Sequence, residues 1–446
     1  MDAETSGSRS INHLPVEILG EIFLWVLVKY SARTGSQGPW FLGHVCGLWR
    51  SISLALPQLW AEVWISSSWL IRIAELEEHL LRSADALLSV HIIGERIPQP
   101  AARNNALIKL MELVLRHCER WRVLVIMPDR DIDRLFELLE PAKNRFPVLE
   151  KLHFEYSWLD HVQSEVFLYA PKLVDLVYMA QSTAIQLPWN QIQSCYIVGA
   201  IDNPLVSLQF AQNLLNLNLS LESDRLGFIP AASIVLPRLQ HLCCFCGSDL
   251  PSLTTPALES LFLSAGSELD LVSGFLARSR CPLKRLLIKE DVARDSDYYY
   301  GWPVTDMDIV IGMLRLTPAL ELLILVASSW PKKFKRADQD SRSLADDDAE
   351  DSEFPCPEPN VESLFDALQL TGSPTDIVPN LSTFIYGLPY DPIVWTSFMA
   401  MARSRSLASV RFLGSWDLSD VLVEQNVKEI QAEALRVLVP ANFPAS

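Results

Sequence analysis

The sequence predicts an α/β protein with a small helical module at its N-terminus, followed by a solenoid whose strands form a parallel sheet. Two observations lead to this fold class. Residues 11–65 contain two short helical patterns that are unusually rich in large apolar residues. The rest of the chain repeats one short apolar phrase at a near-constant interval, which is typical of stacked structural repeats.

The composition is that of a globular protein of 446 residues, of which 49% are hydrophobic and 20% are charged. The formal net charge of −17 disfavours binding to nucleic acid or to an anionic membrane, because phosphates would be repelled. The polar N-terminal stretch is neither a signal peptide nor a transit peptide, and no apolar run reaches the ~18–20 residues that span a bilayer. The 8 cysteines are too few for a disulfide scaffold. We therefore expect a cytoplasmic and/or nuclear protein without nucleic-acid or membrane partners.

The first predicted helix lies within residues 11–28 and begins near Pro15, where the missing N–H costs nothing. Its apolar residues form two adjacent lines at four-residue spacing. One line contains Ile18, Ile22 and Val26, and the other contains Leu19, Phe23 and Leu27. Together they exceed the roughly 100° stripe that a core-facing helix buries. The excess predicts a partner surface, unless the rest of this chain covers it.

A second helix is predicted within residues 40–56, after the turn-forming stretch 31–39. One face of it would carry Val45, Trp49, Ile52 and Leu56. Pro57 ends this helix, and residues 57–66 are expected to be extended. Leu59, Val63 and Ile65 would lie on one side of that segment, with Trp60, Glu62 and Trp64 on the other.

Three blocks in this region, "LPVEILGEIF", "VCGLWRSI" and "PQLW", occur in the order found in the F-box, which residues 11–65 therefore resemble. The resemblance implies a helical module that binds a Skp-family adaptor, and through it a cullin–RING ubiquitin ligase. The family's adaptor-binding, module-core and polar positions fall on Leu14, Pro15, Glu17, Ile18, Leu19, Ile22, Phe23, Val45, Cys46, Trp49 and Arg50. The connection at 31–39 is longer than in the compact form. The tryptophans that follow look most like the expanded fungal F-box families.

The repeated phrase is P-x-L-x-x-Φ-x-Φ, where Φ is apolar. Its eleven strong and weak copies begin at residues 121, 149, 173, 192, 214, 239, 258, 283, 320, 381 and 407. Most of the gaps lie within a residue of the 20–29 residues of a leucine-rich repeat, and the phrases resemble the irregular leucine-rich repeats of F-box proteins. The apolar pairs predicted to share the core face of a strand are Leu152 with Phe154, Leu242 with Cys244, Leu261 with Leu263, and Leu323 with Leu325.

Helical stretches such as 129–143 and 305–316 would connect these strands. The asparagine or cysteine that usually follows the repeat strand is missing, so regular curvature is not predicted. The alternative is an ordinary α/β domain with several short buried strands. The predicted organisation is a disordered tail at 1–10, the F-box module at 11–65, a helical connection at 66–120, the repeat array at 121–330, a disordered charged insertion at 331–360, and remaining repeats with a C-terminal cap at 361–446.

No catalytic signature of quality is present, and we expect neither an enzyme nor a cofactor. In "HLCCFC" (241–246), Cys243 and Cys246 have the spacing of a zinc or redox pair, but buried structural thiols are the favoured interpretation and no metal is expected. On the inner surface of the repeats, the residues expected to bind a target protein are Lys151, His153, Glu155, Asn216, Asn218, Phe245, Phe262 and Arg285. Neighbours on that surface include Asp175, Met179, His241 and Lys289. Leu322, Ile324 and Val326 form either an apolar patch or a covered face.

These features together predict the substrate-recognition subunit of a Skp–cullin–F-box ubiquitin ligase. The module would bind the adaptor, and the repeats would bind an unknown target by protein–protein interaction. The alternative is a non-ligase scaffold whose F-box still docks on the adaptor.

Overall fold

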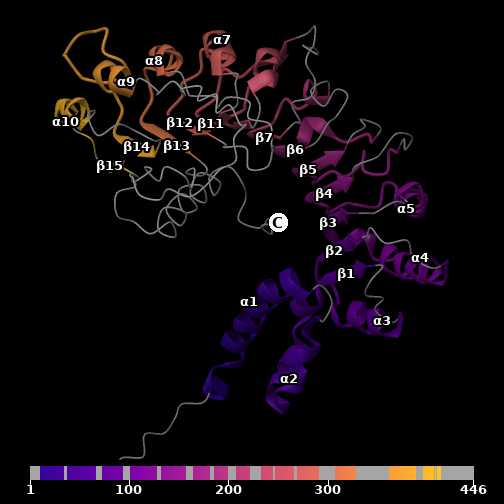
Figure 1. The fold of residues 1–446 in the computed structure, drawn as a ribbon. Helices are drawn as coiled ribbons and strands as arrows, with labels where there is room; N and C mark the ends of the chain where they lie inside the picture. The colour runs from indigo at the N-terminus through magenta and orange to yellow at the C-terminus, as the bar shows by residue number, and fades with distance from the viewer. Residues whose placement is uncertain are drawn as a thin grey trace, which may run out of the picture. The chain divides into compact units, whose positions relative to one another are not determined.

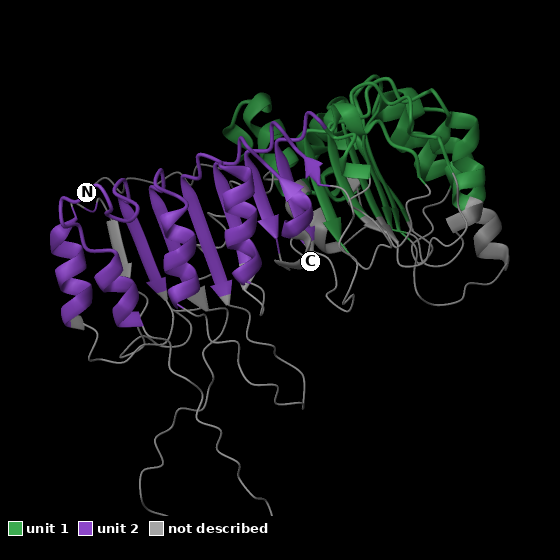
Figure 2. Ribbon diagram, turned by 90° about the horizontal axis from the view of Figure 1, so that it is seen from above, with its two compact units in different colours: residues 1–211, 444–446 green, residues 212–443 purple. Residues whose placement is uncertain are grey.

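The computed structural model describes most of the chain and divides into two compact units (Figure 2). The described residues are 11–34, 38–66, 73–93, 101–127, 132–156, 164–180, 185–198, 207–220, 233–244, 247–265, 269–290, 307–327, 361–387, 395–405, 407 and 409–412. Unit 1 comprises residues 1–211 with 444–446, and unit 2 comprises residues 212–443. The predicted tail at 1–10 and the predicted insertion at 331–360 lie outside the described residues.

Unit 1 begins with a helical module. Its elements are η1 (Ile11–His13), α1 (Val16–Thr34), η2 (Gly38–His44), α2 (Gly47–Ala55) and η3 (Pro57–Trp60). The backbone N–H of Leu19 donates to the carbonyl of Pro15 (3.0 Å), so the helix starts at the predicted proline. The module core consists of Leu19, Phe23, Leu42, Leu59 and Trp60.

The prediction that residues 57–60 are extended is wrong. They form the 3₁₀ turn η3, and Trp60 is only 1% exposed instead of lying opposite Leu59. The reason is a tertiary contact: the Trp60 indole Nε1 donates to the carbonyl of Ser53 (2.7 Å), and its ring packs edge-on against Trp40 (4.7 Å between centroids).

The sheet of unit 1 follows directly and runs parallel, in chain order. Its strands are β1 (Glu62–Ser66), β2 (Leu88–Ile93), β3 (Trp121–Met127), β4 (Lys151–Tyr156), β5 (Asp175–Ala180) and β6 (Ser194–Val198). The helical segments between them are α3 (Ile73–Arg82), α4 (Ala101–Leu115), η4 (Cys118–Arg120), α5 (Ile132–Leu139), η5 (Glu140–Ala142) and η6 (Trp189–Gln191). The array therefore starts before residue 121, because residues 66–120 contain a sheet strand as well as helices. β2 lacks the proline–leucine phrase and shows only the alternating burial of a short strand.

Unit 2 continues the same architecture. Its parallel strands, in sheet order, are β7 (Asn216–Ser220), β9 (His241–Cys244), β11 (Ser260–Ala265), β12 (Arg285–Glu290), β13 (Leu322–Ala327), β14 (Thr383–Gly387) and β15 (Ser409–Phe412). A small pair, β8 (Ile234–Val235) and β10 (Leu253–Thr254), lies beside η7 (Gly247–Ser252). The helices are α7 (Leu269–Ser279), α8 (Met307–Arg315), α9 (Val361–Ala367) and α10 (Trp395–Ser404). The helices predicted within 129–143 and 305–316 are confirmed as α5 and α8.

The proline–leucine phrase forms a β-turn just before the strand. In one copy, the N–H of Leu173 donates to the carbonyl of Ala170 (3.1 Å), and Pro171 takes the second position, where its fixed φ fits. The same bond joins Leu239 to Leu236, Leu258 to Thr255, Leu320 to Thr317, and Leu381 to Val378. The leucine that ends the turn is buried: Leu173, Leu239, Leu258 and Leu320 are 0% exposed. In these repeats the turn therefore places a buried leucine just before the strand, so that the strand begins at the same distance from the core residue each time.

A backbone ladder replaces the missing asparagine ladder. The carbonyl of Glu150 accepts hydrogen bonds from the N–H groups of both Val174 and Asp175 in the next repeat (3.0 Å each). The same double acceptance occurs at the carbonyls of Val174, Leu215, Gln240, Glu259, Lys284 and Glu321, with N···O distances of 2.8–3.0 Å. A carbonyl has two lone pairs and can accept both bonds. At these seven junctions, backbone hydrogen bonds alone fix the register between the start of one strand and the start of the next.

In both units the helices cover one face of the sheet (Figures 1 and 2). In unit 1, the ring of Phe136 on α5 packs on Phe154 of β4 (5.7 Å between centroids). In unit 2, Phe365 on α9 packs on Phe384 and Tyr386 of β14 (6.2 and 5.6 Å). The predicted core pairs are confirmed on this face: Leu152, Phe154, Leu242, Cys244, Leu261, Leu263, Leu323 and Leu325 are all at most 2% exposed. The opposite face is hereafter the inner face.

The described part of unit 2 contains one buried arginine that ties its last repeats together. Arg405 is 4% exposed, and its guanidinium donates to the carbonyls of Val378 (2.7 Å), Ile377 (2.6 Å) and Leu368. Three backbone acceptors around α9 and the turn before β14 are thereby satisfied by a single side chain.

We predict that Arg405→Met lowers the free energy of unfolding by about 2–4 kcal/mol, because it leaves three buried carbonyls without a donor. The matched control is Arg403→Met, since Arg403 is exposed near the end of α10 and should change stability by less than about 0.5 kcal/mol. Urea unfolding followed by circular dichroism measures both. Equal effects of the two substitutions would show that the buried hydrogen bonds contribute nothing specific.

Candidate protein-binding surfaces

The two apolar lines of α1 have different surroundings. Leu19 and Phe23 are 0% exposed and belong to the module core. Ile18 is 48% exposed, and Trp25, seven residues further along the same side, is 68% exposed. Leu14, one turn before Ile18, is 39% exposed. One line therefore builds the module core, while on the other line Ile18 is exposed and Ile22 and Val26 are half-buried. We call Leu14, Ile18 and Trp25 the exposed stripe.

The second predicted helix contributes partly as expected. Trp49, Ile52 and Leu56 pack against the module core, but Val45 lies before the helix and is 59% exposed. The prediction that Val45 shares their buried face is therefore wrong. Its backbone lies in the connection between η2 and α2, where its N–H donates to the carbonyl of Leu42 (3.3 Å).

Trp49 has a structural role in the module. Its ring contacts Phe23 (4.7 Å between centroids), and its Nε1 donates to Oδ1 of Asn12 (2.9 Å). This hydrogen bond holds the first turn of α2 beside the residues that precede α1. Loss of Trp49 would therefore disturb the core as well as any docking surface.

The remaining predicted adaptor-binding residues divide between surface and interior. Pro15, Glu17 and Arg50 are exposed, while Ile22 and Cys46 are half-buried. The Arg50 guanidinium Nε donates to the carbonyl of Gly43 (2.9 Å), which fixes its side chain over the turn before α2. Cys46 is the residue that precedes α2, and its side chain makes no capping hydrogen bond there.

The inner face of unit 1 carries polar and aromatic side chains. Its middle row, read across the strand register, is Trp64, His91, Val125, His153, Val177 and Tyr196. The rings of Trp64 and His91 are stacked (4.0 Å between centroids, 5° between planes). The Trp64 Nε1 donates to Oε1 of Glu62 (3.0 Å), which also lies 3.6 Å from Nε2 of His91. This arrangement is rigid and amphipathic, as in many protein-binding surfaces.

Burial, and secondly the neighbouring imidazole of His153, lower the pKa of His91 to about 4. His91 is therefore neutral at pH 7, and its contact with Glu62 is not an ion pair there.

In the row before, Lys151 forms an ion pair with Asp175 (2.8 Å). Lys151 and His153 lie on the inner face as predicted; the side chains of Glu155 and Met179 lie outside the described residues.

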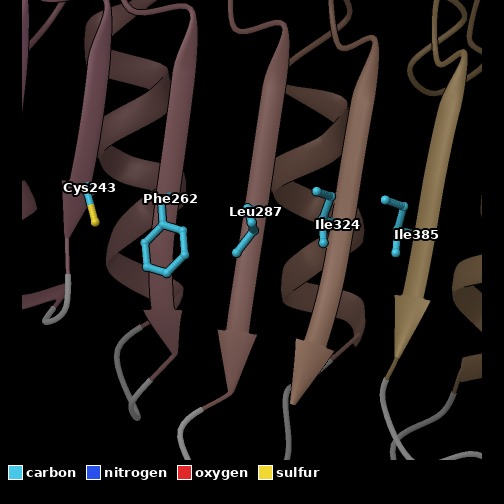
Figure 3. Packing of buried hydrophobic residues seen from close by; sticks show 5 residues of the cluster. All are labelled: Cys243, Phe262, Leu287, Ile324 and Ile385. Atoms are coloured by element: carbon cyan, nitrogen blue, oxygen red, sulfur yellow. The ribbon is translucent and has the colours of Figure 1, made fainter. Parts of the chain in front are cut away.

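The inner face of unit 2 has an apolar middle row. Cys243, Phe262, Leu287, Ile324 and Ile385 come from five neighbouring strands and lie side by side on the side away from the helices (Figure 3). Their exposure is 0–7%, and Leu322 packs against them. Phe262, predicted to contact a target, is therefore buried at 4%, and so is Asn218 at 8%. Cross-strand packing within the row contributes to the burial of Phe262.

The other predicted target-binding residues of unit 2 lie in the row before. Asn216 and Arg285 are half-buried on the inner face, and Arg285 Nη2 lies 3.4 Å from Nδ1 of His241. Phe245 lies outside the described residues. Of the two open alternatives for the strand containing Ile324, the structure shows that Ile324 belongs to a buried row.

The cysteines of residues 241–246 that the structure describes do not point toward a common site. Cys243 lies on the inner face and Cys244 on the helix face of β9, and Cys246 lies outside the described residues. Burial raises the pKa of the Cys243 thiol, which disfavours the thiolate that a metal or a redox reaction needs. Among the described residues, no three His, Cys, Asp or Glu side chains gather closely enough to hold a metal ion.

Sequence reasoning missed Trp64 and His91 as members of the inner face, because it started the array at residue 121. It also did not assign Val125, which lies within the first predicted repeat. It also missed Leu287 and Ile385 as members of the apolar row. The signal was present in the strict alternation of each strand: the residue next to each core position faces inward.

Comparison with known proteins adds little to these surfaces. No family model matches the chain, and no curated protein matches it. A solved structure of an internalin from Listeria monocytogenes is similar, with a TM-score of 0.31 and 10% sequence identity over 86% of this chain and 94% of that chain. At this TM-score the similarity does not bear on function, and the repeat architecture stands on the strand register above. Within the described residues, no helix has both the length and the apolarity to cross a bilayer.

We predict that His91→Phe reduces the acid sensitivity of stability between pH 6.5 and 4. The folded-state pKa of His91, about 4, lies below its unfolded value of 6.5, so the unfolded chain binds the extra proton and stability falls through this window. Phenylalanine keeps the ring beside Trp64 and cannot bind a proton. The difference in unfolding free energy should reach about 3 kcal/mol at most near pH 4. Parallel pH profiles for the two proteins, measured by urea unfolding, would contradict this assignment.

Proposed function

We propose that this protein is the substrate-recognition subunit of a Skp–cullin–F-box ubiquitin ligase. The observation that supports the proposal most directly is the exposed stripe of α1. The three sequence blocks of the F-box coincide with a module whose own core uses Leu19 and Phe23, while Leu14 and Ile18 remain accessible. An exposed apolar stripe of this kind promotes aggregation when the protein is free, and it stabilises a complex when a partner helix covers it.

The adaptor would contact the stripe together with neighbouring exposed residues. Val45 is 59% exposed, and the exposed Arg50 is held by its bond to Gly43. Apolar residues surrounded by charged ones resemble the core and rim of a protein interface. In this proposal Leu19, Phe23 and Trp49 act indirectly, by shaping the module.

The repeats would hold the target on the inner face. Because the parallel strands keep a constant register, their inward side chains form rows that run across the sheet. These rows provide a broad surface for a protein ligand. Ubiquitin transfer would be carried out by other subunits, so this chain would have no catalytic residues of its own. Its place in the cell would be the cytoplasm or the nucleus, where the ligase operates.

A second candidate function is a non-ligase scaffold that uses the same module to bind the adaptor. The two functions share the docking surface and differ in what happens to the protein bound by the repeats.

We predict that Leu14→Ala combined with Ile18→Ala abolishes co-purification of a Skp-family adaptor. Central apolar contacts of an interface commonly contribute about 2 kcal/mol or more each. Because both side chains are exposed, the melting temperature should not change. The control is Leu81→Ala, the same truncation at a 73% exposed leucine on α3. Adaptor binding that survives the double substitution, or is lost equally in the control, would contradict the docking model.

A second prediction separates receptor from scaffold. In cells that express the intact chain, a set of proteins should gain ubiquitin, and this set should disappear with Leu14→Ala and Ile18→Ala. Proteomic comparison of ubiquitylated peptides measures the difference. If adaptor capture is lost in the variant while no ubiquitylated protein changes, the scaffold function is the correct one.

A further inference from the structure

Three residues of this chain carry a hydroxyl immediately before a proline: Thr255, Thr317 and Ser373. Each of them begins the same kind of β-turn, with the proline in the second position, where its fixed φ fits. The carbonyl of the hydroxyl residue accepts from the N–H of the fourth residue, at 3.2 Å from Leu258, 3.1 Å from Leu320 and 3.0 Å from Asp376. The three sites therefore share a dipeptide and a local backbone structure.

The three turns differ in burial, because their fourth residues differ. Leu258 and Leu320 are 0% exposed, and the threonines that begin their turns are 0% and 1% exposed. In the third turn the fourth residue is the half-buried Asp376, so no leucine draws the turn into the core. Ser373 is half-buried, and none of residues 371–376 is buried. Of the three hydroxyls, that of Ser373 is therefore the one that an enzyme can reach in the folded chain.

The surroundings of Ser373 leave room for an enzyme. Gly372 has a φ of +78°, which glycine adopts without strain, and a β-carbon there would meet no atom within 4 Å beyond its chain neighbours. On the other side, Pro374 and Thr375 are exposed. The proline also disfavours helical backbone at Ser373. A modifying enzyme can therefore hold the chain on both sides of the serine.

The hydroxyl of Ser373 is engaged within the turn itself. Its Oγ lies 2.7 Å from Oγ1 of Thr375 and accepts from the N–H of Thr375 (3.3 Å). The hydroxyl of Thr317, by contrast, donates into helix α8, to the carbonyl of Leu314 (3.2 Å). Using the Ser373 hydroxyl for chemistry therefore breaks contacts with one exposed residue and leaves the helices and the sheet intact.

The carboxylate of Asp376 closes this segment. It accepts from Oγ1 of Thr371 (2.7 Å), from the N–H of Thr371 (3.0 Å) and from the N–H of Gly372 (2.9 Å). The hydroxyl of Thr371 first, and then the backbone N–H groups, hold the pKa of Asp376 below its usual range, so it is ionised at neutral pH. A phosphate on Ser373 would add a charge of about −2 at the other end of a turn whose Cα ends lie within about 7 Å. The two anions repel each other.

The buried cation beneath this turn cannot offset that repulsion. Arg405 is 4% exposed, and its three donor nitrogens already bond the carbonyls of Leu368, Ile377 and Val378. Releasing the guanidinium toward a phosphate would leave these carbonyls without their donor. The phosphate would therefore weaken the contacts of Asp376 rather than form a new ion pair with Arg405.

We propose that Ser373 is a phosphorylation site for a kinase that requires proline after its acceptor residue, and that the phosphate opens the segment closed by Asp376. In the reaction, Oγ of Ser373 forms a bond to the γ-phosphorus of ATP, and the bond from that phosphorus to the β–γ bridging oxygen breaks. ADP leaves, and the hydroxyl proton passes to a base of the kinase and then to solvent. The inference does not rest on adaptor or target binding.

The test incubates the purified full-length chain with magnesium, ATP and an activated mitogen-activated protein kinase, which requires proline after its acceptor. Mass spectrometry of proteolytic peptides should place phosphate on Ser373, and Ser373→Ala should remove it. Labelling of Thr255 and Thr317 should be about a hundredfold slower or more, because their hydroxyls become accessible only when the chain opens.

A proteolytic digest of the unmodified chain, given the same kinase, is the matched control. Burial is then removed at all three sites, so the peptides of Thr255 and Thr317 should also accept phosphate. The proposal is overturned if Ser373 stays unlabelled in the folded chain, or if either threonine is labelled there as fast as Ser373. If the two threonine peptides remain unlabelled in the digest, burial is not what selects the site and the argument fails.

Hydrogen exchange read by mass spectrometry tests the effect of the phosphate. Exchange at residues 371–373 should become faster in the phosphorylated chain and approach that of Asp376→Ala, which removes the acceptor. Asp366→Ala, an exposed acid on α9, is the control and should leave exchange at 371–373 unchanged. Unchanged exchange after phosphorylation would overturn the opening of the segment. Loss of adaptor capture would overturn the proposed ligase function and leave each of these results as it is.

Discussion

The repeat architecture depends on one backbone interaction: at seven of the described strands, the carbonyl just before the strand accepts two N–H groups from the next repeat. The interaction needs no particular side chain, so repeats with unrelated sequences can stack in the same register. It also makes the register independent of the intervening length. The carbonyl of Glu321 accepts from Ser382 and Thr383, although 61 residues separate the leading leucines of these two repeats. An insertion between repeats is therefore tolerated, because only its ends must meet the ladder.

Constant register separates the two faces of the sheet. Every second residue enters the helix-covered core, and the alternating residues form level rows on the inner face. The rows are continuous surfaces: the inner face of unit 1 contains stacked imidazole and indole rings, and that of unit 2 contains a buried apolar row. The pKa of His91 is low chiefly because the side chain is buried, and secondarily because the imidazole of His153 lies in the same row, one strand further on.

The helical module shows the same division between folding and recognition on a smaller scale. One line of α1 builds the core with Trp60, against which Trp49 packs, while Ile18 and Trp25 beside it stay exposed. The apolar excess that raised the question of a partner thus has two parts with different energetics. Truncating a core residue would leave a cavity, whereas truncating an exposed residue would leave the packing of the core intact.

The sequence by itself determined the elements that depend on local patterns: the helix after Pro15, the turns at each proline–leucine phrase, and strands whose alternate residues are buried. Only the tertiary structure decided which apolar residues stay exposed, because two adjacent helical lines are equivalent until a core is built on one of them. It also decided that Trp60 turns inward, that β1 and β2 join the sheet, and that Phe262 is covered by its neighbours. These outcomes depend on contacts between segments far apart in the chain, which local periodicity does not encode.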